Sequence, residues 1–433
     1  MRWPFAVLLV VATLPGGRLA SQQQPPQLQV TLNEAIERAL QVQPAMVQAR
    51  GDQRNAGAAM RASLGSYLPT VSTSGSSQRI GGTRFNSSTN QIVTAPASTT
   101  FNGGLTASLV LFDGFSRLAD TRSSHATQDA AEAGVTNQRF QVNLQTKQAF
   151  YNALATEELV RVAEAQVRRA QQQLQISINK LHAGSATRSD SLRSLVDYGN
   201  SRIALLQAQA NLATAQANLG RQIGVDAPVR AVPDSVLPAL PDTAGLRQST
   251  IANMPQVEQA DAQARAAGAQ VGVARAQYWP TFSASVGNSY SGSEAPWTST
   301  STYLKGWRVV FSGQWNIFNG FSREKQISSA VVARDVAQAK AADTRRQMSA
   351  QLTQQITALA TAFEKISIAE TNVAAATEDL RVQNERYRVG AATILDLLTS
   401  QTALTTAEQN LVQVRFDYLI ARAQLEAVVG RTL

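Results

Sequence analysis

Few side chains in this sequence could perform acid–base, nucleophilic or metal chemistry. The chain has two histidines, His125 and His182, and no cysteine, so disulfides, thiol catalysis and cysteine–metal sites are excluded. The sequence contains no Ser/His/Asp arrangement, phosphate-binding glycine loop or paired-histidine motif. We therefore expect neither an enzyme nor a bound cofactor or metal ion, and we interpret His182 as a polar surface residue.

Two aspartates are distinguished by a spacing that occurs twice. Asp190 lies three residues after Thr187, and Asp396 lies three residues after Thr393. A threonine and a carboxylate at this spacing form a capping box, in which each side chain accepts a hydrogen bond from a backbone N–H at the start of a helix. Replacing such a cap typically costs about 0.5–2 kcal/mol. The same carboxylates carry negative charge, which at a narrow opening would attract cations.

A glycine precedes each of these boxes. Gly390 follows a stretch that contains no glycine after Phe321, and Gly184 follows another long helical pattern. Glycine is the usual residue just beyond the end of a helix, where the backbone turns into the left-handed region. The segments 184–187 and 390–393 are therefore predicted to be turns between two helices.

The composition is typical of long helices that pack through small side chains. Hydrophobic residues make up 44% of the chain, but aromatic residues make up only 6%, so a thick aromatic core is not expected. The formal net charge is +9. Because Lys and Arg do not cluster among aromatic residues, we expect no nucleic-acid partner.

The N-terminus has the pattern of a secretory signal peptide over residues 1–20. Arg2 supplies a positive charge, and Phe5–Leu14 is a short apolar run followed by small residues. Residues 21–30 are expected to form a flexible lead-in. No other segment approaches 18 consecutive apolar residues, so the exported protein should be periplasmic, secreted or an outer-membrane barrel.

Most of the chain consists of two copies of one unit. Tyr67–Thr70 recurs as Tyr278–Thr281, and Phe112–Arg117 recurs as Phe318–Arg323. The two glycine–threonine turns recur in the same order. Chance similarity would not keep this order along the whole chain.

The copies are separated by a proline-rich segment. Residues 227–241 are predicted to be a structureless linker between copy one, about residues 31–226, and copy two, about residues 242–433. Each copy is expected to contain a helix, two strands and two further helices. The first helix of copy one begins at Thr31, where Glu34 completes a capping box.

Alternation with a period of two predicts two strands in each copy. Trp307–Phe318 has apolar and aromatic residues on one face and mainly polar residues on the other, over the length of a tilted membrane strand. The strands are placed at about residues 68–80, 101–112, 281–290 and 307–318. The polar stretches 74–100 and 287–302 are expected to be exposed loops. The edge of a soluble β-sandwich would show a similar alternation.

Four long helices follow the strands, at about residues 116–181, 187–223, 322–388 and 393–429. In the third, apolar residues from Leu352 to Tyr387 recur at spacings of three and four, which is a heptad seam. At 1.5 Å per residue this helix would be about 100 Å long. Helices of this length must pack against partners over their whole length.

Four membrane strands cannot form a closed barrel, because closed membrane barrels begin at eight strands. An open sheet in lipid would leave backbone groups unsatisfied, so the chain must oligomerise. Two chains would supply eight strands around a filled interior, and three would supply twelve strands around a channel. The sequence thus predicts a mainly α protein with a membrane β-barrel portion and a long α-helical coiled-coil tunnel.

The doubled unit resembles the TolC family of outer-membrane channel proteins over about residues 31–432. The resemblance is carried by the Phe-Asp/Asn-Gly turns and by the tips Leu181–Gly184 and Tyr387–Gly390 with their downstream aspartates. It implies a homotrimer with a 12-stranded barrel in outer-membrane lipid and a helical tunnel in the periplasm. It also implies a passive exit channel of a tripartite efflux pump or type I secretion system. The implied partners are a periplasmic adaptor (membrane fusion) protein and an inner-membrane pump of the RND, ABC or MFS type.

The resemblance also implies roles for residues at the tips. A periplasmic gate would contain Asp396, Tyr387 and Thr399, where Asp396 matches one of two acidic positions and Thr399 replaces the other. The adaptor-docking tips would comprise Gly184, Ala186, Thr187, Asp190, Gly390, Ala391, Ala392 and Thr393.

The latch of the closed mouth matches the family pattern at one position and departs from it at two. Tyr387 matches an aromatic that latches the closed mouth, although a heptad seam residue would look the same. Ala392 stands where the basic latch partner is expected, and Gln175 stands where an acidic residue is expected. We therefore expect the closed mouth to be held differently, or less firmly.

A second class of protein would also need long helices, namely a periplasmic coiled-coil adaptor or scaffold without a pore. The alternation in Trp307–Phe318 favours the channel, because an adaptor needs no aromatic-rimmed strand of that length. The transported substrate cannot be predicted from the sequence.

Overall fold

The computed structural model describes residues 28–233, 238–241, 253–298 and 303–433. The predicted signal peptide, most of the lead-in and the predicted start of copy two at residue 242 lie outside these ranges. The elements of copy one are β1 (Leu28–Val30), α1 (Leu32–Val42), α2 (Pro44–Gly65), β2 (Thr70–Asn86), β3 (Gln91–Phe112), α3 (Ser116–His182), α4 (Arg188–Gln222) and β4 (Val229–Ala231). Those of copy two are α6 (Pro255–Ala276), β5 (Thr281–Gly292), β6 (Leu304–Gln314), α7 (Ser322–Arg388) and α8 (Ile394–Val429).

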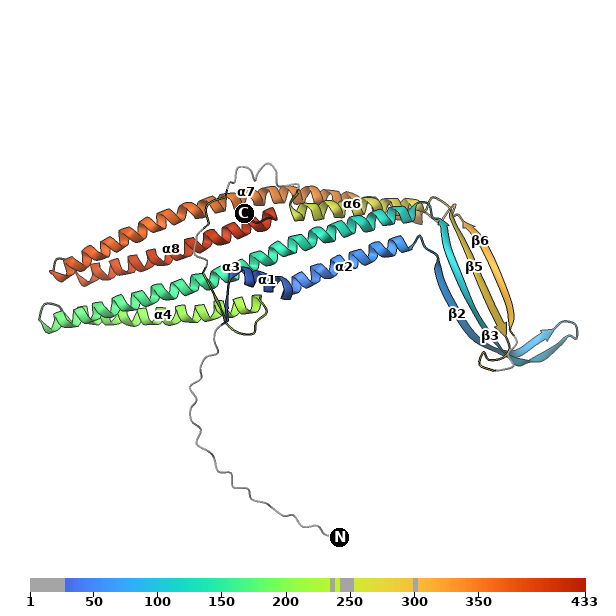
Figure 1. The fold of residues 1–433 in the computed structure, drawn as a ribbon, viewed down its shortest axis with the longest axis horizontal. Helices are drawn as coiled ribbons and strands as arrows, with labels where there is room; N and C mark the ends of the chain where they lie inside the picture. The colour runs from blue at the N-terminus through green and yellow to red at the C-terminus, as the bar shows by residue number, and fades with distance from the viewer. Residues whose placement is uncertain (1–27, 234–237, 242–252, 299–302) are drawn as a thin grey trace, which may run out of the picture.

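Two long helical hairpins lie side by side and the main sheet lies at their far end (Figure 1). α3 and α4 form one hairpin, α7 and α8 form the other, and α3 packs against α8. α3 and α7 have 67 residues each and are therefore about 100 Å long. α2 and α6 pack beside the halves of α3 and α7 that approach the sheet.

Within the described residues, no helix is both long enough and apolar enough to cross a membrane.

The two motifs that recur in both copies meet at the joint between helices and sheet. In copy one, Arg117 donates from its backbone N–H and from Nε to the Asp113 carboxylate, at 2.9 and 3.1 Å. The Arg117 guanidinium lies 4.9 Å from the centroid of the Tyr67 ring. In copy two, Arg323 lies 4.0 Å from the ring centroid of Tyr278. The same cation–π contact therefore links the segment before a strand to the start of a long helix in both copies.

The main sheet has the strand order β2-β3-β5-β6, and each pairing is antiparallel. Residues in register across the strands form rows that alternate between an apolar face and a polar face. One apolar row comprises Val71, Ala107, Val286 and Val309, and the next row, on the polar face, comprises Ser72, Thr106, Gly287 and Arg308. Within the described chain, the outer edges of β2 and β6 are unpaired.

The predicted loop over residues 74–100 is wrong. β2 and β3 continue through it as a two-stranded ribbon, with Thr83 paired to Thr94 and a tight turn in which Asn90 has φ 51°. β-branched threonines favour the extended backbone even without an apolar face, and that preference was hidden by the polar composition. Similarly, β5 continues to Gly292 inside the second expected loop, of which residues 299–302 are not described.

The predicted strand over residues 307–318 ends too late. β6 stops at Gln314, and the following aromatic residues belong to the joint with α7. The Trp315 indole N–H donates to the Tyr278 carbonyl oxygen at 3.1 Å, and the Phe318 and Phe321 rings pack edge to face at 5.6 Å. The period-two alternation in the sequence continues past Gln314, because the aromatic side chains that follow pack in the joint and do not belong to the strand.

The predicted linker is also not structureless throughout. β4 pairs in parallel with β1, which lies at the end of the predicted flexible lead-in. Val30 and Val229 are fully buried against a cluster that includes Phe150 and Leu219. This small sheet attaches the start and the end of copy one to the middle of α3.

Gly220, near the end of α4, has no room for a side chain. A Cβ there would lie 2.3 Å from the carbonyl oxygen of Ala227 and 3.0 Å from that of Val225. We expect Gly220→Ala to lower the free energy of unfolding by about 1–3 kcal/mol through overpacking, measured as a lower Tm in detergent. The control is Gly268→Ala in α6, where a Cβ meets no atom within 4 Å. That control should raise stability by roughly 0.5–1 kcal/mol. An unchanged Tm in Gly220→Ala would contradict this packing.

Candidate functional site at the hairpin tips

Each helical hairpin ends in a short turn shaped by one glycine. Gly184 has φ 72° and Gly390 has φ 80°, where a side chain is disfavoured. In the second tip the Ala391 backbone N–H donates to the Arg386 carbonyl oxygen at 2.7 Å. The Arg386 guanidinium donates in return to the Ala391 carbonyl oxygen at 3.3 Å. The turns are therefore held by backbone geometry, and both are exposed at their glycines.

Both predicted capping boxes are present. The Thr187 and Thr393 backbone N–H groups donate to the Asp190 and Asp396 carboxylates at 3.0 and 2.9 Å. In return, each aspartate N–H donates to the threonine hydroxyl, at 3.3 and 3.2 Å. Each aspartate therefore stabilises the start of its helix whatever other role it has.

The Asp396 carboxyl is also electrostatically tuned. The hydrogen bond from the Thr393 backbone N–H, with help from the Thr393 hydroxyl and the Arg386 charge, lowers the pKa of the Asp396 carboxyl below its usual value. A lowered folded-state pKa stabilises the fold above the ordinary aspartate pKa, and this contribution is lost as pH falls through the lowered value. Asp396 therefore stays ionised at neutral and mildly acidic pH.

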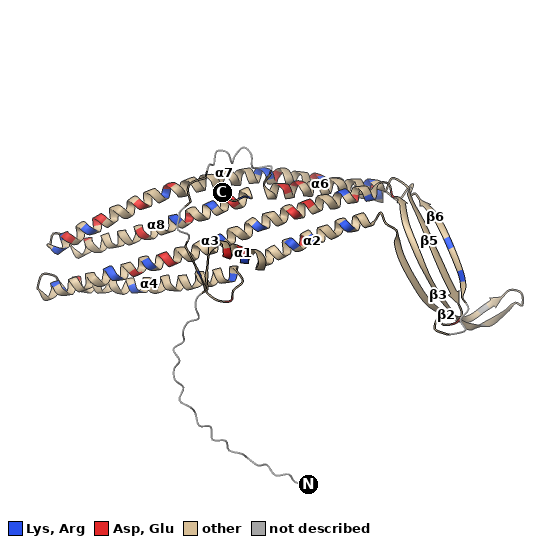
Figure 2. Cartoon of the chain, viewed as in Figure 1, with Lys and Arg blue, Asp and Glu red and all other residues tan. Residues whose placement is uncertain are grey.

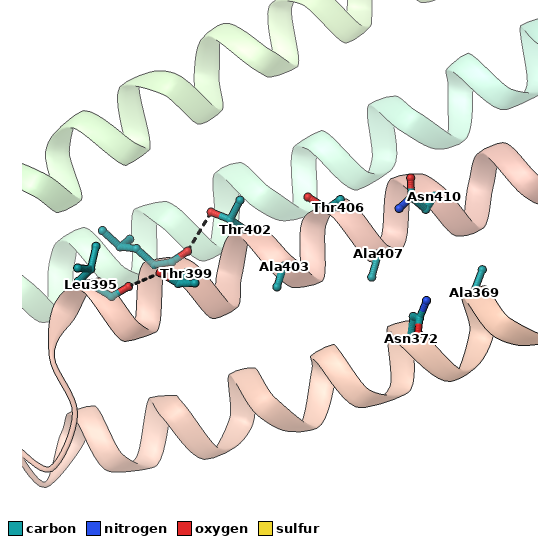
Figure 3. Close-up of a pocket in the computed structure, with 10 residues that line it drawn as sticks. Ala369, Asn372, Leu395, Thr399, Thr402, Ala403, Thr406, Ala407 and Asn410 are labelled. Atoms are coloured by element: carbon teal, nitrogen blue, oxygen red, sulfur yellow. Dashed lines mark hydrogen bonds between the residues drawn. The ribbon is translucent and has the colours of Figure 1, made fainter.

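Thr399 lies one turn after Asp396 on the exposed side of α8. Its hydroxyl donates to the Leu395 carbonyl oxygen at 2.8 Å, so it is turned onto its own helix. Thr399 lines a groove of about 690 Å³ between α7 and α8 (Figure 3). The groove is lined by Leu398, Thr402, Asn410 and other uncharged residues, and the position that could have carried a second acid is neutral.

Tyr387 is buried between α7 and α8. It packs in a cluster with Leu380, Ile394, Leu397 and Leu404. Its hydroxyl is buried and has no hydrogen-bond partner among the described residues. Ala392, at the position of the family's basic latch residue, packs against the same cluster. The structure therefore shows Tyr387 as a seam residue of its hairpin.

The two hairpins are joined at their tips by Lys180 of α3. Its Nζ lies 4.0 Å from the centroid of the Tyr387 ring and donates to the Tyr387 carbonyl oxygen. Gln175, where an acidic partner was expected, instead donates to Asn179 of its own helix at 3.0 Å. Sequence reasoning missed Lys180. The available signal was the internal repeat, which aligns Lys180 with Arg386, four residues before the tip glycine.

The seams of the two hairpins differ in chemistry. The copy-one seam is polar near its tip, with Ser177 hydrogen-bonded to Ser194 of α4 at 2.8 Å and to Gln173 at 3.1 Å. The matching part of copy two is the apolar Tyr387 cluster. Farther from the tips, Arg169 of α3 makes a bidentate ion pair with Glu408 of α8, at 3.2 and 2.8 Å.

The sequence model of a family described as outer membrane efflux protein matches residues 35–225 and 246–431, one match in each copy. The chain belongs to the outer membrane efflux protein family. Members of this family are outer-membrane proteins, so the protein lies in the outer membrane, with its long helices in the periplasm.

Curated relatives carry matching descriptions. The chain is 23% identical over 327 residues to the probable efflux pump outer membrane protein TtgC of Pseudomonas putida, covering 72% of this chain and 63% of TtgC. It is 25% identical over 346 residues to the outer membrane efflux protein BepC of Brucella suis, covering 77% and 73%. The chain thus spans less than two thirds of the length of TtgC.

Solved channel structures share the fold. The structure of CusC superposes with a TM-score of 0.80 at 19% identity and covers 92% of each chain. The CmeC outer membrane channel of Campylobacter jejuni superposes with a TM-score of 0.79 at 17% identity, covering 92% of this chain and 85% of CmeC. Family and neighbours alike are described as channels or efflux proteins.

The contact between Lys180 and Tyr387 predicts the local stability of the second tip. Lys180→Met should raise hydrogen–deuterium exchange in residues 385–392 by about five- to thirtyfold. That range corresponds to about 1–2 kcal/mol for a lost cation–π contact and charged hydrogen bond. Lys180→Arg should restore protection. The control is Arg188→Met, an exposed basic residue of the same hairpin. Equal exchange in Lys180→Met and the wild type would show that Lys180 does not stabilise the second tip.

Proposed function

We propose that this protein is the outer-membrane exit channel of a tripartite efflux pump or a type I secretion system, conducting substrates passively from periplasm to exterior. The observation that carries the proposal is the main sheet, which has one apolar face, one polar face and two unpaired edges within the described chain. In lipid such edges must pair with further copies. A periplasmic adaptor without a pore does not need a sheet with one apolar face and one polar face.

Exposed apolar side chains on the long helices support an oligomer. On α4, Leu195, Ile203 and Leu206 are 52%, 67% and 64% exposed. On α7, Ile368 and Val382 are exposed, two heptads apart. Such stripes on long helices fit coiled-coil packing against another copy. We assign a homotrimer, because three sheets supply the twelve strands that can surround a channel.

In this trimer the second tips would meet around one axis at the periplasmic mouth. Three copies of Asp396, kept ionised by their caps, would form a ring of negative charge that favours cations. The neutral Thr399 makes this ring weaker than one with two acids per copy. Lys180, through its contact with Tyr387, would hold the mouth closed in place of the missing basic and acidic latch residues.

Asp396→Asn should lower cation selectivity and weaken block by multivalent cations in planar bilayer recordings, because it removes the ring of charge. The lowered pKa predicts that wild-type block persists as pH falls toward about 3.8, the ordinary aspartate value. The matched control is Asp190→Asn, which alters the equivalent cap in the other tip. Conductance and block unchanged by Asp396→Asn would leave Asp396 only its role as a cap.

We assign the exposed tips to docking of a periplasmic adaptor, which would link the channel to an inner-membrane pump. The residues concerned are those of the two turns and their caps, including Gly184, Ala186 and Thr187 in one tip and Gly390 in the other. The relatives have names as different as cobalt-zinc-cadmium resistance protein CzcC and proteases secretion protein PrtF. We therefore assign no substrate and no pump class.

Gly390→Val should reduce efflux supported by the adaptor, because a β-branched residue is strained in the left-handed backbone of this tip. Drug or metal susceptibility of cells that carry the matching adaptor and pump measures the effect. Bilayer conductance of the purified protein should remain. The control is Gly268→Val in α6, outside both tips, where the backbone is helical and a Cβ meets no atom within 4 Å. Full efflux with Gly390→Val would contradict the docking role.

A further inference from the structure

The apolar face of the main sheet has a hollow near its outer end, away from the helices. The hollow has a volume of about 540 Å³. Its lining includes Gly75, Phe101, Gly103, Tyr290, Trp297 and Tyr303. These residues come from β2, β3, β5 and the loop that precedes β6, so the hollow is built from both copies of the repeat.

Two glycines form the floor of this hollow. Gly75 pairs with Gly103, which pairs with Tyr290, and all three belong to one row on the apolar face. A Cβ at Gly75 would meet no atom within 4 Å, and one at Gly103 would meet only the Ser74 carbonyl oxygen, at 3.8 Å. Packing of the strands therefore does not require glycine here. The missing side chains leave open space on the lipid-facing side.

Aromatic side chains form the walls. The Phe101 and Trp297 rings meet edge to face at 6.0 Å, although Trp297 remains 81% exposed. The Tyr303 hydroxyl donates to the Glu294 carbonyl oxygen at 2.9 Å, which ties Tyr303 to the segment that follows β5. A membrane protein that leaves an aromatic hollow open on its apolar face presents it to acyl chains.

Two basic residues lie on the apolar face near the hollow. Lys305 pairs directly with Tyr290, and Arg79 lies two residues beyond Ser77, which lines the hollow. Both are exposed, and neither forms an ion pair or hydrogen bond with another described residue. Among the described residues, Lys305 is the charged position on the apolar face of the four-stranded part of the sheet. Arg79, paired with Thr99, lies beyond that part on the two-stranded β2–β3 ribbon, and Figure 2 shows how little charge the strands carry otherwise.

The position of these charges fits the edge of a membrane. Between Lys305 and Gly313 the apolar face of β6 carries Trp307, Val309 and Phe311. Eight residues of tilted strand span about 20–25 Å, close to the height of the apolar band of an outer-membrane barrel. Lys305 therefore lies at headgroup level, where basic side chains attract anionic lipid, and Arg79 lies farther out along β2.

We propose that this hollow is a binding site for an anionic, acylated lipid of the outer membrane. The acyl chain lies against Phe101, Tyr290 and Trp297, and the phosphate lies beside Lys305. The inference rests on the proposed function, because it requires the apolar face to meet lipid. An acyl chain joined to a phosphate matches the hollow and the adjacent positive charge of Lys305 together, whereas a free anion matches only the charge.

Native mass spectrometry of the detergent-purified full-length oligomer tests the site, with phosphatidylglycerol and phosphatidylcholine of equal chain length as probes. The wild type should retain phosphatidylglycerol in preference to phosphatidylcholine. Lys305→Gln should weaken phosphatidylglycerol retention about fivefold, the usual effect of one basic residue at a membrane surface. Gly75→Leu, which fills the floor, should weaken retention of both lipids. The control is Arg308→Gln, on the polar face of the same strand, which should change neither.

Equal retention in the wild type, Lys305→Gln and Gly75→Leu would overturn the proposal. Displacement of phosphatidylglycerol by inorganic phosphate at equal concentration would also overturn it, because the site would then be a simple anion site. Bilayer conductance of the same preparations separates the two claims. A conducting wild-type oligomer that retains no lipid would refute the lipid site alone, whereas a wild type that neither assembles nor conducts would refute the proposed channel.

Discussion

The four-stranded sheet has too few strands to close on itself in lipid, and the proposed channel depends on that constraint. Its strands have an apolar and a polar face, but β2 and β6 each have a free edge within the described chain. Backbone groups on such edges cannot remain unpaired in lipid. In the proposed channel, assembly with further copies is therefore a condition of membrane insertion, and the exposed apolar residues of α4 and α7 would be the corresponding contact surfaces in the helical part.

The joint between sheet and helices is held by the same kind of contact in both copies. Arg117 and Arg323 each stack on a tyrosine that precedes a strand, and in copy one the arginine is also bound by Asp113. These contacts occur once per copy, so each long hairpin leaves the sheet in a defined direction. About 100 Å farther on, the two hairpins meet again through Lys180 and Tyr387.

Features set by local backbone chemistry could be predicted from the sequence. Helix ends at Gly184 and Gly390 and the boxes of Thr187 and Thr393 depend only on neighbouring residues, and the structure has them where the residue types require them. The β2–β3 ribbon could not be predicted, because its stability comes from backbone pairing between polar segments. β4 could not be predicted either, because three residues acquire their partner from the far N-terminal end of the copy.

At the tips, too, a feature with a local cause could be predicted from the sequence, and a contact between distant residues could not. The position of Asp396 in its cap follows from the sequence, whereas the contact of Lys180 with Tyr387 depends on two helices from different copies lying side by side. The polar copy-one seam at Ser177 and the apolar copy-two seam also differ although the repeat aligns them. The two hairpin tips of the chain therefore differ, and Lys180 joins them.

Closure of the sheet edges by other copies is the central claim, and cysteine cross-linking tests it most directly. The chain has no cysteine of its own, so an engineered pair has no background. A cysteine at Thr73 on β2 can be combined with one placed in turn at Trp307, Val309 and Phe311 on β6. Since β3 and β5 separate these strands within one protomer, oxidation should yield a ladder of linked chains that ends at three. Monomers alone, or a ladder that stops at two, would contradict the account.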